Sequence, residues 1–162
     1  MAELITFDNL LKALEEYAVA VRNEYQDNLI RNDRIASGDL LNNVEFDVLQ
    51  NGTSFKVNLM LASYWKYLEE GTKPHFPPLS ALLKWIEIKP VLPRPDAQGR
   101  IPRPEQLAFL IGRKIAAEGT AGTKDLQSAV ARINEEHRQK IVEAFTKDVQ
   151  NTMDGYIIEF FK

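Results

Sequence analysis

The sequence predicts an α+β protein, because its hydrophobic pattern changes period twice along the chain. Apolar residues recur every three or four positions in the first 32 residues, at every second position between Val44 and Leu61, and at helical spacing again after Asp125. A period of 3.6 is typical of an amphipathic helix and a period of 2 of a half-buried strand. We therefore expect a long N-terminal helix, an antiparallel β-hairpin at about 44–61, two short middle helices and a long C-terminal helix.

The N-terminal helix is predicted over residues 8–32. Its apolar residues form one stripe: Leu10, Leu11, Leu14, Tyr17, Ala18, Val21, Tyr25 and Leu29. Thr6 or Asp8 is expected to cap the helix start, because a side-chain oxygen can accept hydrogen bonds from the first unpaired amides. A helix of about 25 residues spans roughly 37 Å, which is more than one small core needs. We therefore expect part of the stripe to contact another subunit.

The predicted hairpin rests on two alternating runs and on the residues between them. The runs are Val44, Phe46 and Val48, and then Phe55, Val57, Leu59 and Leu61. Asn51-Gly52 lies between them and is the pair best suited to the positive φ angles of a two-residue turn. Two strands alone are marginally stable in water, so we expect helices to cover the hairpin or another chain to extend it.

Two short helices are predicted in the middle of the chain. The first covers residues 62–70 and ends at Gly71, which can adopt a left-handed backbone conformation. The prolines of residues 74–78 stiffen the loop that follows, and Ser80 is expected to cap the second helix, which carries Trp85.

Two further helical patterns follow. One begins at Pro104 and closes at Gly119. We expect its apolar residues to face inward: Leu107, Phe109, Leu110, Ile111 and Ile115. The long C-terminal helix is predicted from Asp125 to about residue 150. Gly155 and the β-favouring YIIEFF that follows it leave open whether residues 155–161 form helix or strand.

The segment at about 89–104, KPVLPRPDAQGRIPRP, has five prolines in sixteen residues and no hydrophobic period. It predicts an exposed, semi-rigid loop within a single domain of residues 1–162. Between residues 84 and 103 five bases outnumber two acids. A solvated loop explains this local basic charge, and phosphate binding is the alternative.

Composition narrows the class of protein. The formal charge of −3 comes from 23 acids and 20 bases spread along the chain, so no charged tail indicates a nucleic-acid or membrane surface. Cysteine is absent, which excludes disulfides, thiolate metal sites and a cysteine nucleophile. The apolar runs are shorter than a membrane span, and the first ten residues lack the features of a secretory signal. We expect a cytosolic protein.

We expect no catalytic, cofactor-binding or metal site and no enzymatic activity. The chain has two histidines, His75 and His137, and neither has a second histidine at metal-ligand spacing. Adjacent carboxylates such as Glu69-Glu70 point about 100° apart on a helix and cannot share a site. The GTAGT segment has the glycines of a phosphate-binding loop but lacks its lysine and its preceding strand.

Aromatic residues are concentrated in residues 64–85. Five lie in these 22 positions: Tyr64, Trp65, Tyr67, Phe76 and Trp85. Large aromatic side chains dominate both protein cores and interface hot spots. We expect Tyr67 and Trp85 in the core, and we expect Phe76, which prolines hold outward, to contact a neighbouring subunit.

Several motifs together resemble the neck or tail-completion (head-tail joining) proteins of long-tailed bacteriophages. The motifs are Glu70-Gly71-Thr72, Pro77-Pro78, Trp85-Ile86, Leu107-Ala108 with Leu110-Ile111, and Gly119-Thr120. The N-terminal helix and ASGDLLNNV before the hairpin also match, so the resemblance covers most of the chain. The chain departs from the family pattern in its basic, proline-dense residues 93–104 and in its long C-terminal helix.

The resemblance implies a structural virion protein without cofactors, assembled in the host cytoplasm. It implies a homo-oligomeric ring of six or twelve subunits that joins the DNA-filled head to the tail tube, with other neck or connector proteins and the tail-tube or tail-terminator protein as partners. DNA would pass through the lumen without specific binding. We expect the interfaces to include Tyr64, Trp65, Glu70, Gly71, Thr72, Phe76, Arg94, Arg100 and Arg103.

Two alternatives belong to other functional classes. The first is a nucleic-acid-binding module that uses the basic residues 84–103, for which salt-dependent retardation of DNA in a gel is the distinguishing test. The second is a small hydrolase built around His75 and Glu70, for which loss of activity in a His75→Ala variant is the test.

Overall fold

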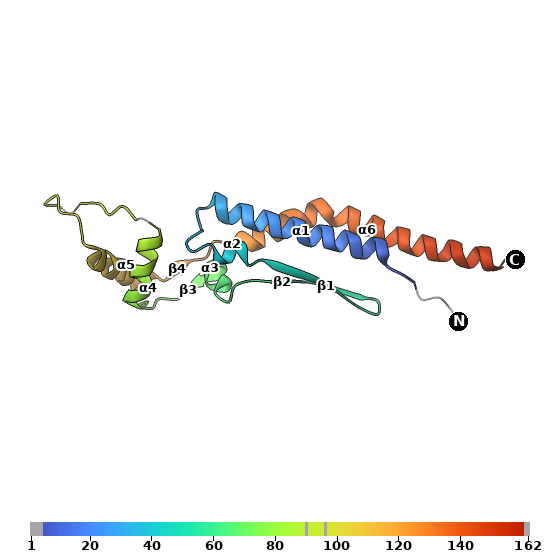
Figure 1. The fold of residues 1–162 in the computed structure, drawn as a ribbon, viewed down its shortest axis with the longest axis horizontal. Helices are drawn as coiled ribbons and strands as arrows, with labels where there is room; N and C mark the ends of the chain where they lie inside the picture. The colour runs from blue at the N-terminus through green and yellow to red at the C-terminus, as the bar shows by residue number, and fades with distance from the viewer. Residues whose placement is uncertain (1–4, 90, 96, 161–162) are drawn as a thin grey trace. The chain divides into compact units, whose positions relative to one another are not determined.

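The structure is a computed structural model that describes residues 5–89, 91–95 and 97–160. The described residues have a mixed α+β fold, as predicted, and form two compact units (Figure 1). Unit 1 combines a segment ending at Asn32, a segment from Asn43 to Leu61 and a segment beginning at Asp125, and unit 2 contains the residues between them. The expectation that residues 1–162 behave as one domain stays a prediction, and each unit is described by itself.

Unit 1 is a pair of long antiparallel helices with a β-hairpin against it (Figure 1). Its elements are α1 (Asp8–Arg31), β1 (Glu45–Asn51), β2 (Ser54–Met60) and α6 (Asp125–Phe160). The predicted stripe on α1 supplies the core of this unit, in which Val21, Tyr25 and Leu29 are each 1% exposed. Burial of one such side chain contributes roughly 1.5–3 kcal/mol to folding, so the stripe is a principal source of stability for the helix pair.

The start of α1 is capped from α6. Phe7 occupies the N-cap position and its side chain makes no capping hydrogen bond. Instead the Asp148 carboxylate accepts a hydrogen bond from the Leu10 amide at 2.8 Å and another from the Asn9 amide at 3.2 Å. The expectation that Thr6 or Asp8 caps this helix is therefore wrong, because a buried carboxylate 138 residues away takes that role.

The opposite end of the helix pair is tied by side chains of α1. The Asn28 side-chain amide donates to the Asp125 carbonyl at 3.0 Å, and the Asn32 side-chain amide donates to the Asp125 carboxylate at 2.6 Å. Polar bonds at both ends fix how far one helix is shifted along the other, which apolar packing alone specifies weakly.

The hairpin packs one face on the helices. Arg22 of α1 lies 5.5 Å above the Phe46 ring. The Phe7 ring is edge-on to Phe55 at 5.2 Å and stacks with Phe145 of α6 at 6.1 Å. The alternating residues thus face the helices, as the period-2 pattern predicts.

The hairpin turn differs by one residue from its prediction. Asn51 pairs with Ser54, so the two-residue loop is Gly52-Thr53 rather than Asn51-Gly52. Gly52 has φ 61° while Thr53 is not among the residues with positive φ, which matches a type II′ turn. As a result Phe46 pairs with Leu59, whereas the predicted loop would have placed it opposite Val57.

The C-terminal residues 155–160 are helical, which settles this part of the helix-or-strand question, and Phe161 lies outside the described residues. Residues 149–160 continue α6 past the end of α1 that Asp148 caps (Figure 1). We call this stretch the overhang. Twelve helical residues span about 18 Å.

Unit 2 contains short helices and one pair of very short strands. Its elements are α2 (Asp39–Asn42), α3 (Trp65–Glu70), β3 (Gly71–Thr72), α4 (Leu79–Ile88), α5 (Pro104–Glu118) and β4 (Thr120–Ala121). Helices α4 and α5 pack against each other. Helix α5 begins with Pro104 and ends before Gly119, as predicted, whereas α4 begins at Leu79 without the expected cap from Ser80.

Candidate interface

Two Gly-Thr segments, distant in sequence, form the centre of unit 2. Strand β3 pairs antiparallel with β4, so that Gly71 lies opposite Ala121 and Thr72 opposite Thr120. The two threonine hydroxyls are 2.9 Å apart, and the Thr72 amide donates to the Thr120 hydroxyl at 3.0 Å. We call this four-residue pairing the Gly-Thr crossing.

The crossing requires a glycine in β3 and another directly before β4. Gly71 has φ 80° and ψ −172°, and Gly119, just before β4, has φ 73° and ψ −159°, a region that only glycine occupies readily. A β-carbon on Gly71 would lie 2.1 Å from the Thr120 carbonyl oxygen, and one on Gly119 would lie 2.1 Å from the Thr72 carbonyl oxygen. Gly71 therefore has the expected positive φ but an extended ψ, which differs from the left-handed helical conformation.

Residues 63–73 line a groove of about 430 Å³ beside the crossing. The lining residues are Ser63, Lys66, Tyr67, Glu70, Gly71, Thr72 and Lys73. Of the predicted interface residues, Glu70, Gly71 and Thr72 therefore lie together. Tyr64 and Trp65 lie outside this lining, at the start of α3, where Tyr64 is exposed and Trp65 is half-buried.

Phe76 packs within its own unit. Its ring lies so close to Gly112 of α5 that a β-carbon there would be 2.8 Å from the ring, and its centroid is 6.0 Å from that of Phe109. The side chain is still 47% exposed. The glycine thus makes room for the aromatic ring, and its outer half remains available to a partner.

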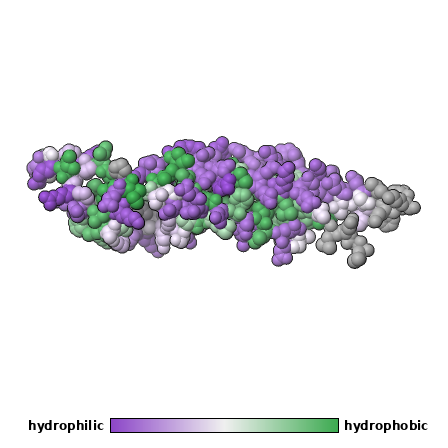
Figure 2. Space-filling model, in the orientation of Figure 1, coloured by the Kyte–Doolittle hydropathy of each residue, from purple (hydrophilic) through white to green (hydrophobic). Residues whose placement is uncertain are grey.

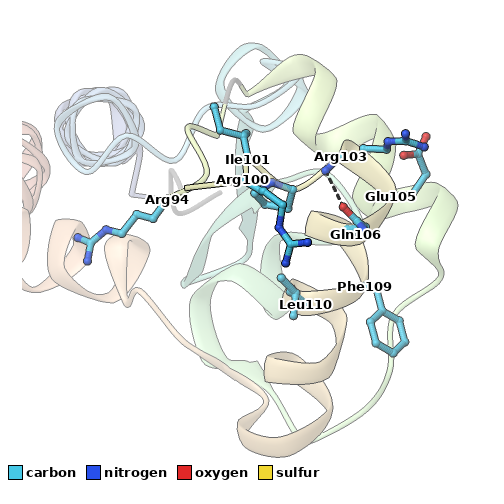
Figure 3. Close-up of a pocket in the computed structure, with 9 residues that line it drawn as sticks. Arg94, Arg100, Ile101, Arg103, Glu105, Gln106, Phe109 and Leu110 are labelled. Atoms are coloured by element: carbon cyan, nitrogen blue, oxygen red, sulfur yellow. Dashed lines mark hydrogen bonds between the residues drawn. The ribbon is translucent and has the colours of Figure 1, made fainter. Parts of the chain in front are cut away.

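The three predicted arginines line one pocket of about 890 Å³ between the proline-rich loop and the start of α5. Figure 3 shows Arg100 directed along α5 toward Leu110, Arg94 extending outward from the loop, and Arg103 beside Glu105. The Arg103 amide donates to the Gln106 side chain at 3.0 Å, which fixes this edge of the pocket to the first turn of α5. The structure therefore brings together residues that the sequence only placed on one loop.

The charge of the pocket favours an anionic partner. Among the described residues, its lining has three arginines and one glutamate, a net charge of +2. The remaining walls are apolar and exposed: Ile101 at 68%, Phe109 at 48% and Leu110 at 51%. Guanidinium groups next to apolar side chains suit a partner that presents carboxylates or phosphates beside apolar groups.

Sequence reasoning missed the apolar half of this pocket. Phe109 and Leu110 were expected to face inward but are about half exposed. The missed signal is the run from Leu107 to Ile111, because five consecutive residues spread over every side of a helix and cannot all face one core.

Two aromatic residues are also more exposed than predicted. Tyr67 is 66% exposed and Trp85 is 38% exposed, so the expectation that they lie in the core is wrong. Figure 2 shows hydrophobic residues on the visible surface of both units. Exposed large apolar residues in such number are typical of proteins that associate with partners.

The described histidines make structural contacts. The Nδ1 of His75 donates to the Lys73 carbonyl at 2.9 Å, and the ring of His137 lies edge-on to Tyr17 at 6.2 Å. Within residues 5–89, 91–95 and 97–160, no group of three or more His, Asp or Glu side chains is placed to hold a metal ion. In the same ranges, the helices are too short or too polar for any of them to span a bilayer.

Comparison of the chain with protein-family models, curated proteins and solved structures finds no match.

Proposed function

We propose that this chain is a structural protein of the phage neck, where it forms a homo-oligomeric ring of six or twelve copies that joins the DNA-filled head to the tail tube. The proposal begins from the order of motifs in the sequence. It places the chain in the virion and assigns it no enzymatic activity.

The observation that carries the proposal is the Gly-Thr crossing. The resemblance rests partly on two Gly-Thr motifs, and these motifs pair with each other although they are 48 residues apart. Because a β-carbon on Gly71 or on Gly119 would lie too close to the backbone of the other segment, the pairing gives a physical reason for both glycines to occur together. Motifs that meet in space are better support for a resemblance than motifs scattered over a surface.

Incomplete burial supports self-assembly. In unit 1 the overhang exposes Met153 at 58% and Ile157 at 52%, and in unit 2 the pocket exposes Ile101 at 68%. Unit 1 also has a two-stranded sheet, whose edge amides and carbonyls can pair with another chain. A ring built from heterologous contacts would cover such surfaces, because each copy then uses two different faces.

The test is deletion of the gene, followed by electron microscopy of the lysate. We expect free heads beside free tails, and infectious particles when the wild-type gene is supplied in trans. Joined, infectious particles from the deletion would refute the proposal.

Point variants supplied in trans sharpen this test. Gly71→Val disrupts the Gly-Thr crossing, whereas a change at exposed Lys73, two residues away, does not. We expect Gly71→Val to restore far fewer joined particles than Lys73→Ala does. Equal yields from the two variants would show that the crossing is irrelevant to assembly.

A further inference from the structure

We propose that the overhang of one copy binds in the arginine pocket of a second copy. The overhang is residues 149–160 of α6, and the pocket is the space lined by Arg94, Arg100, Ile101, Phe109 and Leu110 with their neighbours. The inference rests on the self-assembly part of the proposed function and names the two surfaces that meet.

The first argument is charge complementarity. The described residues that line the pocket include three arginines and one glutamate, which together have a net charge of +2. Residues 149–157 of the overhang, whose side chains the structure describes, contain Asp154 and no base, a net charge of −1. Guanidinium and carboxylate groups form the strongest charge-assisted hydrogen bonds in proteins, so opposite surfaces of this kind select each other.

The second argument is the arrangement of apolar residues on the overhang. Met153, Tyr156 and Ile157 are three and four positions apart, so they lie on one face of the helix. They are 58%, 37% and 52% exposed, respectively. An amphipathic helix with this spacing is the usual ligand of an apolar groove, and Ile101, Phe109 and Leu110 provide such a groove.

The third argument is the position of the Asp148 cap. Asp148 closes the paired part of α6 at the first turn of α1, so the overhang lies beyond the packing that α1 provides. A helical segment of twelve residues is marginal in water by itself. Docking into a second copy would supply the apolar burial that this segment lacks.

A contact between two different surfaces is head-to-tail. Each added copy covers one pocket and one overhang and leaves one of each exposed at the ends of the assembly. Growth therefore stops only when a ring closes or when a copy lacks one of the two surfaces. This property separates it from a two-fold contact, in which the same patch meets itself.

The experiment is sedimentation velocity on the full-length chain with two variants. The pocket variant is Arg94→Glu with Arg100→Glu, and the overhang variant is Asp154→Ala with Ile157→Ser. The substituted positions are exposed, so both variants should keep the wild-type circular dichroism spectrum. Arg113→Glu with Lys114→Glu on α5 and Glu135→Ala on α6 are the matched controls, because each changes the net charge as much as its variant does, at exposed positions outside the two surfaces.

We expect the wild type and both controls to associate at a protein concentration of about 100 µM, since an interface made by one short helical segment belongs to the weak, transient class. Each variant alone should be monomeric, with association weakened at least about tenfold. An equimolar mixture of the two should form a 1:1 dimer and nothing larger, because the mixture retains one intact pocket and one intact overhang per pair.

Three results would overturn the inference, and they separate it from the proposed function. A monomeric wild type would remove this contact and weaken the ring proposal as well. A wild type that associates while both variants associate equally well would remove only this contact. A pocket variant that keeps its association but loses binding to a fluorescent single-stranded DNA would assign the pocket to nucleic acid instead.

Discussion

A single carboxylate, Asp148, completes the first turn of α1. Its two oxygens accept hydrogen bonds from two backbone amides and from the Asn9 side chain. Burial alone would raise the pKa of this carboxyl group, but the hydrogen bonds from the Asn9 side chain and from the Leu10 and Asn9 amides outweigh burial and lower it. The anion also lies at the positive end of the α1 dipole.

We expect Asp148→Ala to lower the free energy of unfolding by about 1 kcal/mol at pH 7, the usual cost of losing a cap. Urea unfolding followed by circular dichroism measures the change. Asp154→Ala is the control, because Asp154 is an exposed carboxylate on the same helix. If the two variants unfold at the same urea concentration, the cap contributes nothing.

The same cap makes stability depend on pH. Because the pKa of Asp148 is lower in the folded chain than its ordinary value of 3.8, its contribution is complete above that pH and is lost as pH falls through the folded pKa. The difference between wild type and Asp148→Ala should therefore shrink on acidification. A difference that stays constant to the lowest pH at which the chain is folded would contradict this assignment.

Gly71 has both a positive φ and a close contact with the backbone of another segment. Gly99 has a positive φ without such a contact, so comparing the two residues separates the two effects. A β-carbon on Gly71 would meet the Thr120 carbonyl oxygen at 2.1 Å, whereas one on Gly99, at φ 76°, would have open space around it. We expect Gly99→Ala to cost about 1 kcal/mol for the backbone angle alone.

Gly71→Ala should cost clearly more than Gly99→Ala, because β3 and β4 must also separate. The measurement is the urea midpoint of each variant, with loss of hydrogen-exchange protection at the Thr72 amide as the local readout. Equal midpoints and an unchanged Thr72 amide would show that the crossing can relax around a methyl group.

At the scale of whole elements, alternation predicted which face of the hairpin is buried but did not predict its register. Changing the loop from Asn51-Gly52 to Gly52-Thr53 shifts each residue's partner by two positions, and two positions return a side chain to the same face. The hydrophobic pattern is therefore identical for both registers, and the turn decides between them.

Helix existence was predictable, whereas helix caps and helix faces were less so. The signals for α5 are local, since Pro104 starts it and Gly119 follows its end. The cap of α1 is not local, because Asp148 reaches it only after the chain folds. The arginine pocket is intermediate: its charges are visible in one loop, but Phe109 and Leu110 join it only through the orientation of α5.

The pairing of α1 with α6 depends on small residues at close contacts. Ala129 is fully buried on α6, whereas Ala131, two positions further along, is exposed. We expect Ala129→Leu to lower the free energy of unfolding by roughly 1–3 kcal/mol through overpacking. Ala131→Leu should change it by less than about 0.5 kcal/mol.

Thermal and urea unfolding of both alanine variants provide the measurement. The substitution and the host helix are the same, so any difference in helix propensity cancels. Equal stabilities would mean that the two helices separate enough to admit the larger side chain without loss.

At the scale of the whole molecule, the overhang and the arginine pocket lie in different units of the chain. Unit 1 contains the long helix pair and its overhang, and unit 2 contains the Gly-Thr crossing and the arginine pocket. Both have exposed apolar residues that a lone chain does not cover. The proposed head-to-tail contact takes one surface from each unit, the overhang from unit 1 and the arginine pocket from unit 2.

The Gly-Thr crossing has a consequence for how this protein can vary. It joins the two ends of the segment that runs from Thr72 to Thr120, which are 48 positions apart in the sequence. The entropy of closing such a loop grows only slowly with length, at about 0.6 kcal/mol for each doubling. Insertions in this segment that leave the packing of α4 on α5 intact should therefore cost little free energy, so a new loop can be added there without loss of the fold.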